Sequence, residues 1–246
     1  PLADGGREGG ADGGSLVAAR PYKSKVPSKY DPAKPTPLVV LLHGYGAEGA
    51  VQEQYFKLGA VADAETFLYA YPDGTVDAGG KRFWNASTAC CDFLGTKVDD
   101  VAYLTAIVDD MSTRYNVDPK RVYFVGHSNG GFMAYRMACD LAGRVAAIVS
   151  LAGTMDDLNA ACKPSAPVSV LHVHGDADGT IAYPGGTVTS PVMLTLPAQV
   201  VVPAGSWPWT CANAGAVSRV AELIAAKKSA RRNGEKVMVS SDESVR

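Results

Sequence analysis

The stretch Val122-Tyr-Phe-Val-Gly-His-Ser-Asn-Gly-Gly-Phe-Met-Ala-Tyr135 decides the fold of this chain. A β-branched and aromatic run opens it and stops at Gly126, and apolar residues recur at helical spacing after Gly131. The stretch therefore predicts a strand, a sharp turn and a helix. Within the turn, Gly126-His-Ser-Asn-Gly130 fits G-x-S-x-G, in which a strained turn lifts a serine hydroxyl above a sheet. Ser128 is therefore the candidate nucleophile.

A pentapeptide this short also recurs by chance, so its context matters. The strand before it and the helix after it are the setting that the pattern requires. Glycines two residues on either side of Ser128 remove Cβ atoms that would collide where strand and helix approach. A serine hydroxyl is inert at neutral pH, so the rest of the chain must supply a base, an orienting carboxylate and donors for an oxyanion.

Length and charge bound the class of protein. The 246 residues are enough for one α/β domain with a large core, which we expect at residues 15–246 after a glycine-rich, flexible leader at residues 1–14. A formal net charge of -2 gives no electrostatic case for binding nucleic acid or an anionic membrane. No apolar run reaches the ~18 residues of a membrane span. The chain begins at Pro1, so we expect a signal peptide to have been removed or left out.

The five cysteines have no C-x-x-C spacing of the kind that binds zinc. In an exported protein two disulfide bonds and one free thiol would be natural, whereas in a cytosolic protein all five could be buried and reduced. We favour export, to a secreted, periplasmic or cell-surface location. The spacing does not assign the pairs, and the residues are Cys90, Cys91, Cys139, Cys162 and Cys211.

Apolar runs and helical patterns alternate along the chain and are joined by short loops. This alternation predicts a mostly parallel, doubly wound sheet flanked by helices in a single domain. Ligands of such sheets bind at the carboxyl ends of the strands, where Ser128, Tyr45 and Asp178 should gather. We expect strands at 15–20, 38–42, 66–71, 122–125, 145–151 and 168–174, an extended or looped segment at 22–37, and helices at 51–65, from 99 to about 115, and after Ser128.

Four side chains have both a functional and a structural interpretation. His43 follows a buried strand, and we interpret it as a structural histidine, because the backbone of the loop around it is the informative part. Trp84 lies in a loop of about 20 residues and could contact substrate or simply pack in the core. Asp99 and Asp100 open a predicted helix, where acids suit the helix dipole, so capping is their expected role.

Several motifs in one order resemble a known family. The chain is similar, over about residues 16–188, to the α/β-hydrolase family of polyhydroxybutyrate-depolymerase-like and feruloyl-esterase-like secreted serine esterases, which are carbohydrate esterase family 1-like. The motifs are Leu41-Leu-His-Gly-Tyr-Gly46, Tyr71-Pro-Asp-Gly74, Phe83-Trp-Asn85, Val98-Asp-Asp-Val101, Asp118-Pro-Lys-Arg-Val122, Gly126-His-Ser-Asn-Gly-Gly131 and His174-Gly-Asp-Ala-Asp178.

The resemblance implies an ester hydrolase that works through an acyl-serine intermediate. Ser128 would be the nucleophile, and Asp178 would orient the catalytic histidine. Asp176 is the competing acid, and Asp178 is preferred because the family spaces its acid four residues after the histidine that matches His174.

The backbone N–H groups of Tyr45 and Asn129 would form the oxyanion hole, each worth ~3 kcal/mol to the transition state. No metal or organic cofactor is implied, since nucleophile, acid and donors need none. The family suggests small-molecule or polymeric ester substrates: short to medium acyl esters, aryl esters of the feruloyl type, or aliphatic polyesters.

The chain departs from the family at the catalytic histidine, which remains unknown. In this fold the triad runs serine, acid, histidine along the chain, yet there is no histidine after His174. Side chains next to each other in the turn diverge, which disfavours His127 as the base. His172 and His174 share one face of a strand, and His43 lies across the oxyanion loop.

The segment at 189–246 is an atypical tail. It runs apolar and proline-broken, then small and featureless, and then forms a basic helical pattern at 218–233. A frameshifted 3′ region and a divergent C-terminus would both produce it. Besides the esterase, two readings stay open: a catalytically impaired hydrolase-fold protein that binds an ester, a polymer or a glycan, and a serine peptidase on the same fold.

Overall fold

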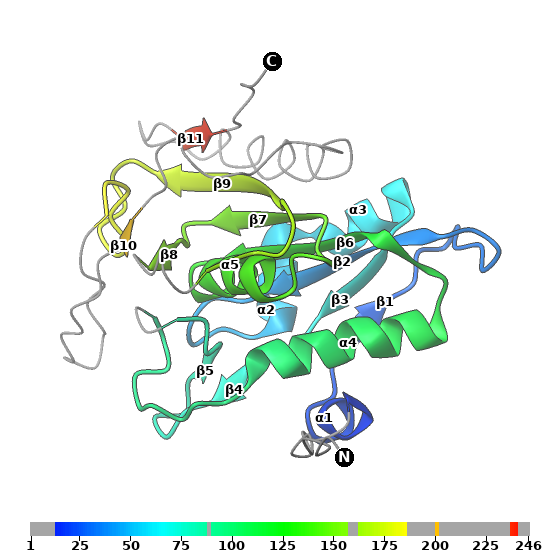
Figure 1. Ribbon diagram of the computed structural model, residues 1–246, viewed down its shortest axis with the longest axis horizontal. Helices are drawn as coiled ribbons and strands as arrows, with labels where there is room; N and C mark the ends of the chain where they lie inside the picture. The colour runs from blue at the N-terminus through cyan, green and yellow to red at the C-terminus, as the bar shows by residue number, and fades with distance from the viewer. Residues whose placement is uncertain (1–12, 88–89, 157–161, 186–199, 202–236, 241–246) are drawn as a thin grey trace, which may run out of the picture.

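A computed structural model of the chain describes residues 13–87, 90–156, 162–185, 200–201 and 237–240. Its main feature is a seven-stranded sheet in the order β1-β3-β2-β6-β7-β9-β11 (Figure 1). The central strands β3, β2, β6, β7 and β9 run parallel to one another. The edge strands β1 and β11 pair antiparallel with β3 and β9. The mostly parallel sheet flanked by helices confirms the predicted fold class.

The strands of the large sheet span β1 Lys23–Lys25, β2 Thr36–Leu42, β3 Leu68–Tyr71, β6 Val117–His127, β7 Ala147–Leu151, β9 Ser169–Gly175 and β11 Val237–Ser240. Two small ribbons pair β4 Thr75–Val76 with β5 Arg82–Phe83, and β8 Met155–Asp156 with β10 Val200–Val201. The helices are α1 Gly13–Ala19, α2 Gly49–Phe56, α3 Leu58–Glu65, α4 Asp100–Arg114 and α5 Asn129–Asp140.

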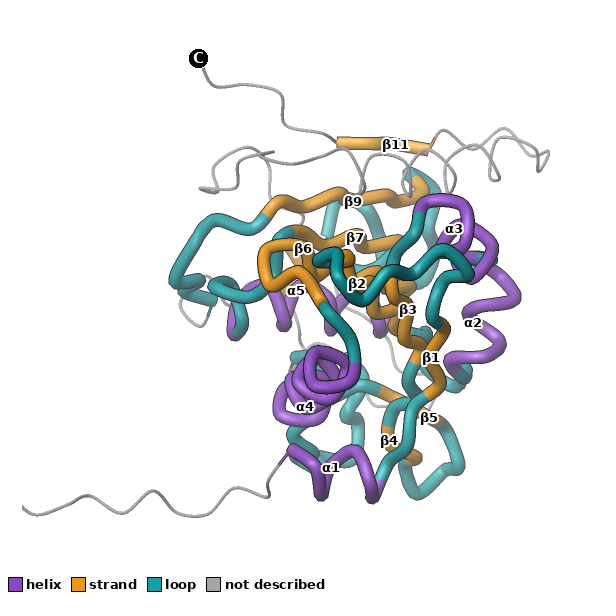
Figure 2. Tube along the Cα trace, turned by 90° about the vertical axis from the view of Figure 1, so that its right-hand side faces the viewer, coloured by secondary structure: helices purple, strands orange, loops and turns teal. Residues whose placement is uncertain are grey.

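The sheet buries both of its faces, and β2 shows how. Leu38, Val40 and Leu42 pack into a core shared with α4 and α5, and α1 adds to that core. Val39 and Leu41 point to the other face, into a smaller core with α2 and α3. Figure 2 shows α4, α5 and α1 on one side of the strands and α2 and α3 on the other. A continuous apolar strand is the expected signature of burial on both faces.

The expected strands at 38–42, 66–71, 122–125, 145–151 and 168–174 are all present, with bounds shifted by a few residues. The helix expected from 99 to about 115 is α4, and Asp99 caps it by accepting a hydrogen bond from Ala102 N–H at 2.8 Å. The helix expected at 51–65 is two helices, because Lys57 adopts φ 58° between α2 and α3.

The strand expected at 15–20 is wrong, because these residues lie in and just after helix α1. The apolar run is too short for its period to separate strand from helix. Leu16 and Val17 pack against the core that contains α4, and a Cβ at Gly13 would lie 3.3 Å from that of Ala106. This packing favours the helix over a strand. The helix begins at Gly13, inside the leader expected at residues 1–14, and residues 1–12 lie outside the described residues.

Among the described residues two disulfide bonds are present, Cys90–Cys91 and Cys139–Cys162. They confirm the expectation of bridged cysteines, although the pairing was not predictable. Cys211, the predicted basic helix at 218–233 and most of the tail at 189–246 lie outside the described residues, which include only β10 and β11 there.

Candidate active site

Ser128 occupies the turn between strand β6 and helix α5, as the sequence predicted. Its backbone has φ 52° and ψ -119°, which a residue with a side chain rarely adopts. Its N–H donates to Leu151 O on the neighbouring strand β7 at 2.8 Å, and its own C=O accepts from Gly131 N–H at 2.8 Å. A strained conformation held on both sides in this way is typical of functional positions.

The glycines around Ser128 are required by close packing. A Cβ at Gly126 would lie 2.0 Å from Gly130 O, and a Cβ at Gly130 would lie 2.3 Å from Leu42 O. The helix after Ser128 therefore starts almost in contact with the ends of β6 and β2. The sequence argument from the two flanking glycines is confirmed in atomic detail.

The loop with Tyr45 lies beside Ser128. A Cβ at Gly44 would be 3.4 Å from Ser128 Cβ. Asn129 is the first residue of α5, so its N–H has no partner within the helix and lies at the positive end of the helix dipole. The structure thus brings the two expected oxyanion donors to the carboxyl ends of adjacent parallel strands, β2 and β6.

His43 orients the peptide group that bears the Tyr45 N–H. Gly74 N–H donates to His43 Nε2 at 2.8 Å, so the ring proton lies on Nδ1, which donates to Gly44 O at 2.8 Å. Because the peptide between Gly44 and Tyr45 is trans, its N–H points away from that anchored carbonyl. His43 is fully buried, burial lowers its pKa, and both ring nitrogens are engaged, as expected of a structural histidine.

Trp84 is completely buried, which favours packing over substrate contact. Its indole N–H donates to His43 O at 3.0 Å, and its backbone pairs with the side chain of Asn129. The sequence left both roles open, because an apolar residue in a long loop gives no sign of whether the loop folds over it. The packing role, which the sequence left open, is the one that the structure supports.

Asp100 lies in the first turn of α4, but its carboxylate does not cap the helix; Asp99 does. Asp100 is 1% exposed, forms an ion pair of 2.7 Å with Arg20 and accepts a hydrogen bond from Asn85 N–H at 2.8 Å. Its pKa is raised by burial, against the lowering effect of Arg20. The acid therefore ties the segment before β1 to the loop after β5, a link that the sequence did not predict.

His172 and His174 belong to a buried chain of hydrogen bonds. His174 Nε2 lies 2.7 Å from Ile181 O, which only accepts, so that nitrogen bears the proton. His174 Nδ1 then accepts from His172 Nε2 at 3.1 Å, and His172 Nδ1 accepts from the Tyr135 hydroxyl at 3.0 Å. All four ring nitrogens are therefore engaged. Neither histidine is available as a general base.

His127 precedes Ser128 in sequence but stacks on Tyr55 of helix α2, with ring centroids 6.0 Å apart. Strand alternation places it with Tyr123 and Val125, which pack on the face covered by α2 and α3. The structure thus agrees with the expectation that the two neighbouring side chains diverge.

Asp178 lies in the loop after β9. In the sheet, β9 is the neighbour of β7, and β7 is the neighbour of β6, the strand that leads to Ser128. One carboxylate oxygen accepts from the N–H groups of Thr180 at 2.8 Å and Ile181 at 3.0 Å, and the other lies 3.4 Å from His174 Nε2. The side chain is thereby fixed, with 20% of its surface exposed. Asp176, the competing acid, is exposed.

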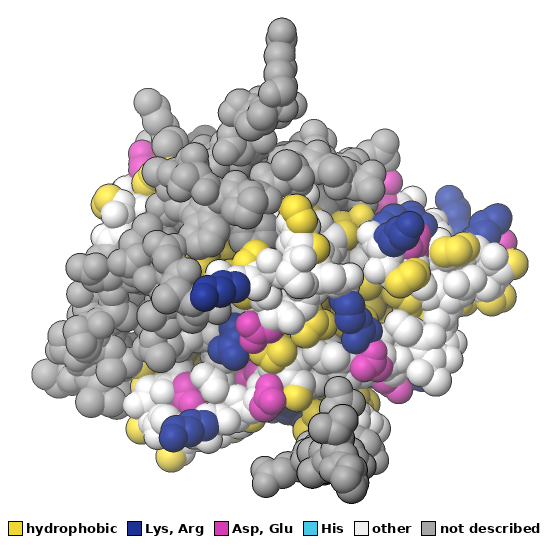
Figure 3. Space-filling view, in the orientation of Figure 1, with side chains coloured by type: hydrophobic (Ala, Val, Ile, Leu, Met, Phe, Trp, Pro, Cys, Tyr) yellow, Lys and Arg dark blue, Asp and Glu magenta, His cyan; other side chains and the backbone are white. Residues whose placement is uncertain are grey.

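Within the described part of the chain, no group of three or more His, Cys, Asp or Glu side chains is arranged to hold a metal ion. A search of the same residues finds no helix long and apolar enough to cross a membrane. Figure 3 shows acidic and basic side chains interspersed on the described surface of one face.

Comparisons with known proteins show which proteins this chain is similar to. Residues 61–183, half of the chain, match the model of the prolyl oligopeptidase family. NocK of Nocardia uniformis subsp. tsuyamanensis, named as an esterase, is 35% identical over 149 residues, which are 61% of this chain and 42% of that protein. Feruloyl esterase B of Piromyces equi is 30% identical over 166 residues, 66% of this chain and 30% of that protein. This chain therefore spans less than half the length of these relatives.

Among solved structures, esterase PE8 superimposes with a TM-score of 0.52 at 22% identity, over 83% of this chain and 97% of that chain. At this identity the likeness supports the fold alone. Because the family model matches half of the sequence, from Val61 through the Ser128 turn to Tyr183, the chain belongs to the prolyl oligopeptidase family, whose members have the α/β-hydrolase fold.

Proposed function

We propose that the chain is a serine esterase that hydrolyses carboxylic esters through an acyl-serine intermediate. The observation that supports it most is the conformation of Ser128, held at φ 52° between β6 and α5 with the Gly44 loop beside it. The names of its relatives agree, because they include feruloyl esterases and a bifunctional acetylxylan esterase/xylanase.

In the first half of the reaction Ser128 Oγ would attack the ester carbonyl carbon. The carbonyl oxygen becomes an oxyanion, which the N–H groups of Tyr45 and Asn129 would stabilise, each by ~3 kcal/mol. The tetrahedral intermediate then expels the alcohol and leaves an acyl-serine. Water repeats the sequence on the acyl-serine and releases the acid.

Asp178 is the proposed acid of the triad, because its loop holds the carboxylate in place at the carboxyl edge of the sheet. The base is the open element of the mechanism. Three of the four histidines, His43, His172 and His174, have both ring nitrogens engaged, and His127 lies on the α2 side of the strand.

The proposed substrates are esters with a short acyl or a feruloyl-type group, free or attached to a polymer. An aromatic wall beside the oxyanion loop is compatible with them, since Tyr45 contacts Phe93 edge to face at 5.4 Å. Export of the protein is part of the proposal, supported by the two disulfide bonds, which persist in oxidising compartments.

The experiment compares hydrolysis of p-nitrophenyl acetate by protein of verified intact mass with that by Ser128→Ala. We expect activity that the substitution abolishes. Equal background rates would refute the esterase and favour a hydrolase-fold binding protein. In such a protein the oxyanion hole and substrate binding alone would accelerate hydrolysis by only ~10³- to 10⁴-fold over the reaction in water. A proline-containing p-nitroanilide in parallel tests the peptidase reading that the family name raises, and faster cleavage of this amide than of the ester would favour it.

A further inference from the structure

Trp84 forms hydrogen bonds with residues on both sides of the candidate oxyanion hole: its backbone bonds the Asn129 side chain, and its indole bonds the His43 carbonyl. We infer that Trp84, together with the side chain of Asn129, is a positioning device that fixes the two oxyanion donors relative to each other. The inference rests on the proposed function, because it concerns the donors at Tyr45 and Asn129.

The backbone bonds of Trp84 hold the start of helix α5. Trp84 N–H donates to Asn129 Oδ1 at 2.7 Å, and Asn129 Nδ2 donates back to Trp84 O at 2.9 Å. Both residues are 0% exposed, so water does not compete for these bonds. A reciprocal pair of bonds fixes both the position and the rotation of the amide, and so of the residue whose N–H faces the oxyanion.

The indole of Trp84 holds the loop after strand β2. The Trp84 indole N–H donates to His43 O at 3.0 Å, and its ring packs on the His43 ring with centroids 5.0 Å apart. His43 in turn anchors the carbonyl of the peptide group that bears the Tyr45 N–H. One residue from a third segment therefore contacts the supports of both donors.

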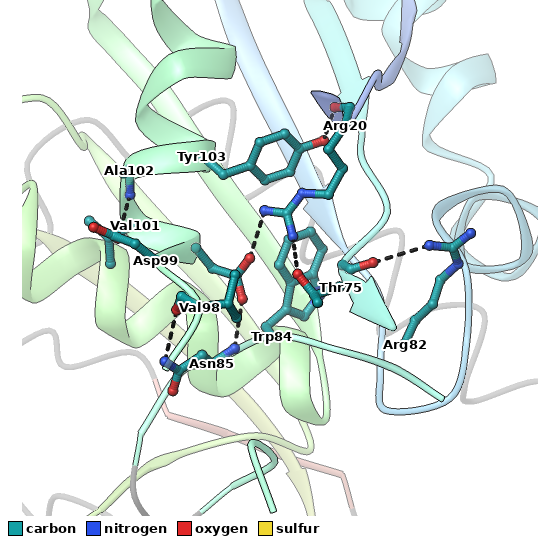
Figure 4. A network of polar contacts seen from close by, with 12 residues as sticks. Arg20, Thr75, Arg82, Trp84, Asn85, Val98, Asp99, Val101, Ala102 and Tyr103 are labelled. Carbon is teal, nitrogen blue, oxygen red and sulfur yellow. Dashed lines mark hydrogen bonds and ion pairs between the residues drawn. The ribbon is translucent and has the colours of Figure 1, made fainter. Parts of the chain in front are cut away.

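Trp84 is itself held from the opposite side. Figure 4 shows the Arg20 guanidinium between the rings of Tyr103 and Trp84, at 3.4 Å and 5.9 Å from their centroids. Arg20 forms the ion pair with Asp100, whose other oxygen accepts from the N–H of Asn85, the next residue after Trp84. The indole thus has little freedom to move when an oxyanion forms.

Rigidity at this point matters because oxyanion donors act through preorganisation. A donor displaced by about 1 Å can lower the rate by ~10²-fold without changing how substrate binds in the ground state. Trp84 is therefore expected to affect kcat, and its loss should leave KM nearly unchanged.

The test is Trp84→Phe, which keeps a smaller aromatic ring near His43 and removes the indole N–H together with the second ring of the indole. We expect kcat per titrated active serine to fall about 10-fold, with KM within about 2-fold of wild type. Asn129→Ala is the second variant, for the case that Trp84→Phe yields little folded protein, and it should lower kcat in the same way. Both substitutions disturb the same network of contacts. The fold-loss of kcat in the double variant should therefore be smaller than the product of the two single fold-losses.

The matched control is Tyr69→Phe. Tyr69 is also 0% exposed and loses one hydrogen bond, from its hydroxyl to Glu53 at 2.5 Å, on the face with α2 and α3. We expect its kcat to be unchanged. A trifluoromethyl ketone, which binds as a tetrahedral oxyanion, separates positioning from general loosening: its affinity should fall with kcat in Trp84→Phe and stay constant in Tyr69→Phe.

Three results overturn the inference: kcat within 2-fold of wild type in both Trp84→Phe and Asn129→Ala, a loss expressed in KM alone, or an equal loss of kcat in Tyr69→Phe. These results differ from a failure of the proposed function. If wild type and Ser128→Ala hydrolyse esters equally slowly, the esterase and this inference both fall.

Discussion

Lowering the pH from 7 to 4 should destabilise the folded protein by about 3 kcal/mol through His172 alone. The ring is 6% exposed and accepts a hydrogen bond from Tyr135 while donating one to His174, which requires its neutral form. Burial, with a smaller effect of the neighbouring His174, lowers the pKa of His172 from 6.5 to about 4.

The sign follows from where the proton binds. In the unfolded chain His172 has the ordinary pKa near 6.5 and takes up a proton as the pH falls below 6.5, whereas in the folded protein it does so only as the pH approaches 4. The stability that His172 contributes is therefore complete above pH 6.5 and is lost as the pH falls towards 4. A difference of about 2.5 pKa units corresponds to about 3 kcal/mol.

The assay is urea unfolding of wild type and His172→Gln at pH values from 7 to 4, followed by tryptophan fluorescence. Glutamine can still donate to His174 but does not titrate, so the difference between the two proteins isolates His172 from other groups, including His43, whose pKa is also lowered. The groups that face His172 are Tyr135 and His174, with Asp178 beyond His174. The stability advantage of wild type should shrink by about 3 kcal/mol; an advantage independent of pH would refute the reasoning.

Three further predictions concern the framework. Gly130→Ala should abolish soluble, folded protein, as seen by yield and circular dichroism, because its Cβ would lie 2.3 Å from Leu42 O; normal folding would contradict the packing at the turn. Removing the Cys139–Cys162 bridge with the double alanine variant should lower the free energy of unfolding by about 3 kcal/mol in urea; an unchanged midpoint would mean that the bond does not form. Asp99→Ala should lower the free energy of unfolding by about 1 kcal/mol through loss of the helix cap. An unchanged melting temperature would show that the cap does not stabilise the protein.

Local patterns predicted the parts of the site that depend on local geometry. The conformation of Ser128 follows from glycines at fixed offsets between a strand and a helix, and all of these lie within a few residues. The loop with Tyr45 follows a run of five apolar residues that could only be a buried strand. In contrast, the strand predicted at Ser15 to Arg20 is a helix, because a six-residue segment with four apolar residues fits either element until its packing partner is known.

The sequence by itself determined the central parallel strands, helix α4, the serine turn with the helix after it, and the edge of the sheet where the candidate site lies, because periodicity, glycine placement and helix capping act over one or two turns of chain. Only the tertiary structure decided that Trp84 is buried and bound to Asn129, 45 residues away, and that His172 and His174 use all their ring nitrogens. Burial and hydrogen-bond partners are properties of the packed chain. They depend on which distant segments meet, and a single sequence contains no local signal for that.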